Sequence, residues 1–182
     1  VRPPRLRDGV AWLLYPAFAS VMLLATTNHV CQDVAVIPFL WVAPLSLYLL
    51  TFIICFDREA WYSRQWFALG AVVSLVAVGF VCQAKGSAPL TWEIGAYFLA
   101  MFLVCMVCHG ELVRRKPHPR FLTAFYLMSS AGGAVGGVVI ALLSPLLFST
   151  HLEMNLCVLG GAALCMSLLL IEASCSWLGD TP

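Results

Sequence analysis

The chain has 182 residues, of which 62% are hydrophobic and 10% are charged, and its mean hydropathy is +0.92. This composition excludes an ordinary soluble domain and predicts a membrane protein that crosses the bilayer several times. The formal net charge is only +1, yet the basic residues are concentrated between apolar stretches and form no nucleic-acid-binding face. We therefore expect the lipid bilayer as a partner and no nucleic acid.

Six apolar stretches reach or approach the roughly 20 residues that a helix needs to cross a hydrocarbon core of about 30 Å. In chain order, these predicted spans are residues 10–27, 34–56, 66–84, 90–108, 121–148 and 156–178. They predict an all-α membrane helix bundle that forms a single transmembrane domain over residues 1–182. The chain begins at Val1 instead of Met and stops at Pro182 soon after an apolar stretch, so we expect it to be an excerpt of a longer protein from which a flanking domain is missing.

The basic residues predict the orientation of the bundle. With the N-terminus in the cytoplasm, Lys85 is the only one of the ten Lys and Arg residues that falls outside. The cytoplasmic segments then hold Arg2, Arg5, Arg7, Arg58, Arg64, Arg114, Arg115, Lys116 and Arg120. Because basic residues beside membrane spans stay in the cytoplasm, we expect both termini to be cytoplasmic in a multi-pass protein of the cell's inner membrane.

A polar cluster that includes Asn28, His29 and Asp33 separates the first two spans. Asp33 is a good N-cap for the second span, and Asn28 can close the first. The same side chains could instead line an outer vestibule, where His29 titrates near neutral pH and Asp33 binds a cation. Both interpretations stay open, and this cluster is our first candidate for a ligand-binding site.

His109 and Glu111 follow the fourth span and form a second candidate site, at the inner mouth, where Glu111 would attract a cation. The alternative is a helix end, in which Gly110 acts as the C-cap and Glu111 pairs with Arg114 or Arg115. We favour the helix end, because a charge at the membrane interface costs less than one at the midplane.

Cys105, Cys108 and His109 match C-x-x-C-H, the attachment pattern of c-type haem, and His118 could complete a zinc ligand set. The cytoplasmic position argues against haem, and a structural zinc site usually needs a second ligand pair with its own spacing. We therefore expect buried thiols, no cofactor and no metal. A haem or metal redox protein is the alternative that this motif leaves open. No catalytic motif occurs in the chain.

The fifth span contains two overlapping G-x-x-x-G spacings, formed by Gly132, Gly133, Gly136 and Gly137. Small residues four apart let two helix backbones approach closely in lipid, so we expect these glycines to lie in a helix–helix contact. The sixth span carries a second small face at Gly160 and Gly161. We predict that the fifth and sixth spans pack there.

Several ordered blocks resemble the membrane region of spermidine synthase-like membrane proteins, a family described as fusions of a major-facilitator-like membrane part with an aminopropyltransferase-like domain. The blocks are residues 24–29 (LATTNH), 33–35 (DVA), Pro38, Trp41, 44–45, 48–49, 108–112 (CHGEL), Pro119, 122–123, 125–127 (FYL) and the glycine pairs that end at Gly137. Together they cover roughly residues 24–148.

The resemblance implies a cytoplasmic C-terminal domain in the full-length protein, with a Rossmann-like fold that binds decarboxylated S-adenosylmethionine and a polyamine. None of that domain's motifs occurs in these 182 residues, so any transferase activity would reside outside this chain. The chain would then anchor that domain and bind or pass a small, cationic solute. The alternative is a free-standing six-span transporter half that acts as a homodimer.

Overall fold

The computed structural model describes residues 6–34, 39–83, 89–143 and 152–179, and within these ranges the chain is all-helical. The long helices are α1 (Leu6–Asn28), α2 (Val42–Asp57), α3 (Arg64–Gln83), α4 (Leu90–Arg114), α5 (Leu122–Val138) and α7 (Leu152–Gly179). Two short 3₁₀ turns, η2 (Glu59–Trp61) and η3 (Pro119–Phe121), precede α3 and α5. The wider π-helical segments η1 (His29–Val34) and η4 (Val139–Leu143) continue α1 and α5. The predicted all-α bundle is confirmed.

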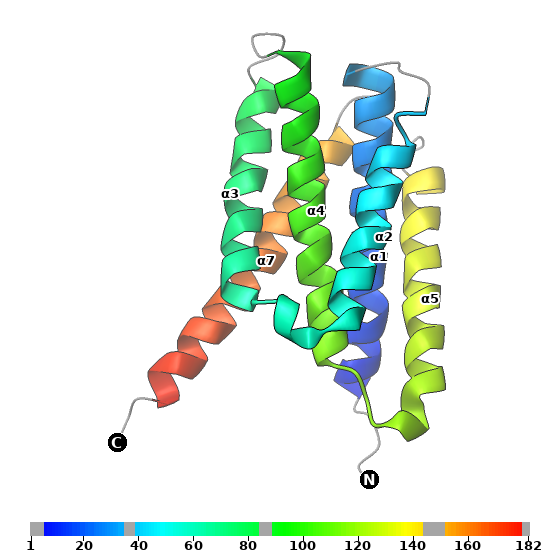
Figure 1. The fold of residues 1–182 in the computed structure, drawn as a ribbon, viewed down its shortest axis with the longest axis vertical. Helices are drawn as coiled ribbons and strands as arrows, with labels where there is room; N and C mark the ends of the chain where they lie inside the picture. Colours follow the sequence, from blue (N-terminus) through cyan, green and yellow to red (C-terminus); the bar gives the residue numbers. More distant parts are fainter. Residues whose placement is uncertain (1–5, 35–38, 84–88, 144–151, 180–182) are drawn as a thin grey trace.

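The helices alternate in direction, so that the start of α1 and the end of α7 lie at the same end of the bundle (Figure 1). Helix α4 lies at the centre and packs against α1, α2 and α3, whereas α5 packs on α1 and α7 packs on α3. Every residue from 104 to 113 of α4 is buried. A helix segment that is buried all round needs no polar face, which explains the unbroken apolar run from residue 104 to residue 108.

Four helical stretches among the described residues are long and apolar enough to cross a membrane: Leu6–Cys31, Arg64–Val81, Leu90–Arg114 and Pro119–Leu142. Two shorter apolar helices, Val42–Asp57 and Leu156–Ile171, accompany them. These lengths are compatible with a multi-pass membrane protein. Phe39 adopts a left-handed backbone conformation (φ 65°) and α2 begins at Val42. Residues 35–38 of the predicted second span lie outside the described part of the chain.

Helices α5 and α1 approach each other backbone to backbone at two glycines of α5. A Cβ built on Gly132 would overlap the backbone carbonyl of Leu13, and one built on Gly136 would overlap that of Ala17. The two glycines and the two carbonyls share the same four-residue spacing, so one turn after another of α5 rests directly on α1. Only glycine permits this separation, since any side chain would push the two helices apart.

The prediction that the fifth and sixth spans pack through their small faces is wrong for the described residues. Helix α5 packs on α1, and α7 packs mainly on α3. The small face of α7 receives larger side chains instead, with Phe18 beside Gly160 and Leu75 beside Gly161. A stripe of small residues predicts a close helix–helix contact, but it does not indicate which helix will be the partner.

Candidate functional site

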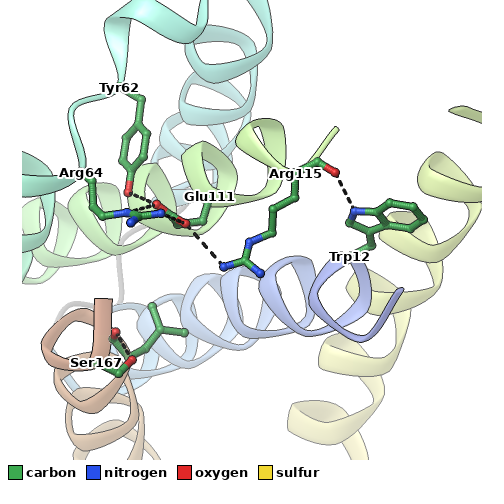
Figure 2. Close-up of polar contacts among 7 residues, drawn as sticks. Trp12, Tyr62, Arg64, Glu111, Arg115 and Ser167 are labelled. Atoms are coloured by element: carbon green, nitrogen blue, oxygen red, sulfur yellow. Dashed lines mark hydrogen bonds and ion pairs between the residues drawn. The ribbon is translucent and has the colours of Figure 1, made fainter. Parts of the chain in front are cut away.

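Glu111 is fully buried near the end of α4 and is held by an arginine from the start of α3 (Figure 2). Arg64 donates from Nε to Glu111 Oε1 at 2.6 Å and from Nη2 to Oε2 at 2.7 Å. Arg115, the C-cap residue directly after α4, places Nη2 3.8 Å from Oε2. We call these three residues the Glu111 clamp. A two-point pair of this kind fixes geometry as well as charge, and it ties α3 to α4.

Tyr62 completes the surroundings of the clamp. Its hydroxyl donates to Glu111 Oε1 at 3.3 Å, and its ring lies so close to Gly110 that a Cβ there would overlap the ring. Burial, and then the negative charge of Glu111, raise the pKa of Tyr62 above its ordinary value. The hydroxyl therefore keeps its proton and remains a donor to the carboxylate.

The fourth helix ends later than the predicted fourth span, which stopped at residue 108. Helix α4 continues to Arg114, and His109, Gly110 and Glu111 are buried inside it. Gly110 is thus no C-cap; its missing side chain makes room for the ring of Tyr62. The main partner of Glu111 is Arg64, 47 residues away in sequence, with Arg115 at a longer distance. Because Arg64 engages both carboxylate oxygens, Glu111 stabilises the fold instead of presenting a free carboxylate to a solute.

His109 points toward α2 and makes one hydrogen bond there. Its Nδ1 lies 3.0 Å from Oγ1 of Thr51, and that hydroxyl donates to the carbonyl of Tyr48 at 2.7 Å. A hydroxyl has one proton to donate, so Thr51 must accept from His109. The Nδ1 atom therefore carries the ring proton, and Nε2 of the neutral imidazole is an acceptor.

Nε2 of His109 has no hydrogen-bond partner in the described part of the chain, although the side chain is only 1% exposed. The rings of Tyr48 and Phe52 pack against the imidazole at centroid distances of 5.0 and 5.3 Å, both nearly perpendicular to it. Most buried polar atoms in proteins are hydrogen-bonded. A buried acceptor without a described partner, in a side chain packed against two aromatic rings, is thus our candidate for the centre of a binding site.

The outer cluster lies far from His109. His29 Nε2 is 2.9 Å from the hydroxyl of Tyr97 on α4, Asn28 is exposed, and the side chain of Asp33 lies outside the described part of the chain. Tyr97 and His109 are 12 residues apart on one helix, which corresponds to about 18 Å at 1.5 Å per residue. The two predicted sites therefore lie at different depths of the bundle.

The C-x-x-C-H residues do not gather around one point. Cys105 and Cys108 are buried free thiols, and Cys105 Sγ lies 3.9 Å from the carbonyl of Ala19 on α1. His118 is exposed, and its Nδ1 accepts from the backbone N–H of Arg120. Within the described ranges, no three His, Cys, Asp or Glu residues are arranged to hold a metal ion. Thiols in such surroundings behave as small apolar side chains.

Both residues of the predicted inner site, His109 and Glu111, are thus buried on α4, but their side chains face different helices. Glu111 faces Arg64 of α3 and is fully paired, while His109 faces Thr51 of α2 and keeps one acceptor open. No protein-family model, no curated protein and no solved structure matches this chain.

Proposed function

We propose that the chain is the membrane module of a spermidine synthase-like protein of the inner membrane, which anchors a cytoplasmic aminopropyltransferase-like domain and binds a small amine inside its bundle. The ordered sequence blocks over residues 24–148 support the family, and the four long apolar helices support membrane insertion. The nine-to-one distribution of basic residues supports cytoplasmic termini.

The open acceptor of His109 carries the proposal of solute binding. Leaving a buried acceptor unpaired costs about 1–3 kcal/mol, and a solute that donates an N–H bond to Nε2 would recover this energy. Ionisable side chains inside membrane bundles commonly mark solute pathways. Aromatic rings within about 6 Å also attract a cation, and the rings of Tyr48 and Phe52 both pack against the imidazole of His109. An amine, which carries donors and a positive charge, satisfies both features.

The expected result is that His109→Leu lowers spermidine binding by about tenfold or more, which is the value of one hydrogen bond that involves a charged group. Binding would be measured with radiolabelled spermidine and with putrescine on the full chain reconstituted in lipid nanodiscs. His118→Leu is the matched control, because it makes the same substitution at an exposed histidine. Equal binding by the wild type and His109→Leu, at equal thermal stability, would contradict the assignment.

A further inference from the structure

The connection between α4 and α5 concentrates positive charge at one end of the bundle. Residues 114–120, which we call the basic turn, read RRKPHPR. Arg115 is directed inward, with its guanidinium 5.2 Å from the ring centroid of Tyr15 and 3.8 Å from Glu111. Arg114, Lys116 and Arg120 are exposed, and none of them forms an ion pair within the described part of the chain.

The clamp explains why these three cations remain unpaired. Glu111 is the only acidic residue in the 27 positions from 94 to 120, and Arg64 and Arg115 already share it. Another acid at this end of the bundle, Asp57, lies 3.8 Å from Arg58. The basic turn therefore presents three positive charges that the described protein does not neutralise.

The basic turn is also held in place, so its charges keep a fixed position. Trp12 of α1 donates from Nε1 to the carbonyl of Arg115 at 2.9 Å (Figure 2). The backbone N–H of Lys116 bonds to Val113, and that of Phe121 bonds to His118. Pro117 and Pro119 fix their own φ angles and restrict the residues before them. Because the backbone of the basic turn is already fixed, a binding partner would have to order only its side chains.

The turn lies where apolar helices end, beside Trp12, whose ring meets that of Phe125 edge-on at 5.5 Å. Tryptophan near the end of a membrane helix is typical of the headgroup level, and basic clusters next to spans attract the anionic lipids of the cytoplasmic leaflet. We propose that Arg114, Lys116 and Arg120 form a binding surface for the headgroups of anionic phospholipids. This inference rests on the membrane insertion and orientation given under Proposed function.

The test measures how strongly the full chain in vesicles prefers phosphatidylglycerol over phosphatidylcholine with the same acyl chains, by native mass spectrometry of the released complexes. Each basic residue near an anionic surface contributes about fivefold at low ionic strength. The variant with Arg114, Lys116 and Arg120 all replaced by Gln should therefore lose a preference on the order of a hundredfold. High salt should also reduce the preference of the wild type for phosphatidylglycerol, because salt screens the charges.

The matched control compares Lys116→Gln with Arg58→Gln, because both residues are exposed but Arg58 already has Asp57 beside it. The first should lose about fivefold and the second should change little. An unchanged preference in the triple variant, or equal losses in the two single variants, would overturn the lipid surface. The lipid surface would also be overturned if the triple variant kept its bound lipids but lost an acidic partner protein that the wild type binds. Extraction of the wild type from the vesicles by a carbonate wash would instead overturn the proposed membrane function itself.

Discussion

Glu111→Gln is expected to destabilise the folded bundle by about 3–5 kcal/mol, the cost of removing one partner from a buried ion pair. The substitution keeps the shape of the side chain but leaves the guanidinium of Arg64, whose side chain is 16% exposed, without its carboxylate. The Tyr62 hydroxyl also loses its charged acceptor. Thermal unfolding of the detergent-solubilised protein, followed by circular dichroism, measures the effect as a lower midpoint temperature.

Asp57→Asn provides the control for this result. It removes the acidic partner of Arg58 from a pair whose side chains are 69% and 72% exposed, so little change in stability is expected. In addition, the double variant Arg64→Gln/Glu111→Gln should be more stable than the sum of the two single changes predicts, because neither charge is then left alone. Equal midpoints for Glu111→Gln and Asp57→Asn would show that the clamp does not stabilise the fold.

Substituting alanine at Gly132 and Gly136 should have the second-largest effect, with each change destabilising the protein by about 1–3 kcal/mol through overpacking. A methyl group at either position would overlap a backbone carbonyl of α1, and backbone cannot swing away as a flexible side chain can. The helices would have to separate along their whole contact. The denaturant or temperature midpoint of the double variant, compared with the wild type, measures the combined loss.

The neighbouring glycines are matched controls on the same helix. A Cβ at Gly133 would meet Oγ of Ser20 at 3.4 Å, and one at Gly137 would meet Cδ1 of Leu24 at 3.9 Å, which are ordinary contacts. Gly133→Ala and Gly137→Ala should therefore change stability little, and the higher helix propensity of alanine could raise it slightly. If all four single variants lost equal stability, the close approach of α5 to α1 would not be the cause.

The fold class could be predicted from the sequence because each helix that crosses the bilayer needs an apolar stretch long enough to match the hydrocarbon thickness. Such stretches are visible in the hydropathy of the sequence. Helix ends were predicted less well. The end of α4 was placed at Cys108 because His109, Gly110 and Glu111 form a polar, glycine-containing stretch, yet all three are buried within the helix. Polar residues continue a buried helix when distant partners satisfy them, and Arg64 and Thr51 are such partners. No local pattern shows which residue 47 or 58 positions away will supply the bond.

The candidate sites show the same limit. His109 was identified as a candidate from its residue type and position, but its open acceptor depends on the tautomer that Thr51 and Tyr48 impose across helices. Likewise, the glycine spacing indicated a close contact without indicating α1 as the partner. The arginine at position 64 was counted for orientation only. Its place at the first residue of an apolar helix, beside Tyr62, was the one local signal of an inward-facing cation.

The orientation of the basic turn in the membrane tests the central claim most directly. Trypsin would be added to intact spheroplasts and to inverted inner-membrane vesicles that contain the full chain, and the fragments would be identified by mass spectrometry. The proposed orientation predicts cleavage after Arg114 and Arg120, both exposed, in the inverted vesicles, and no cleavage at these two arginines in the spheroplasts, where Lys85 is the basic residue on the outer side. Cleavage at these arginines in the spheroplasts, or release of the uncut chain by a carbonate wash, would contradict it.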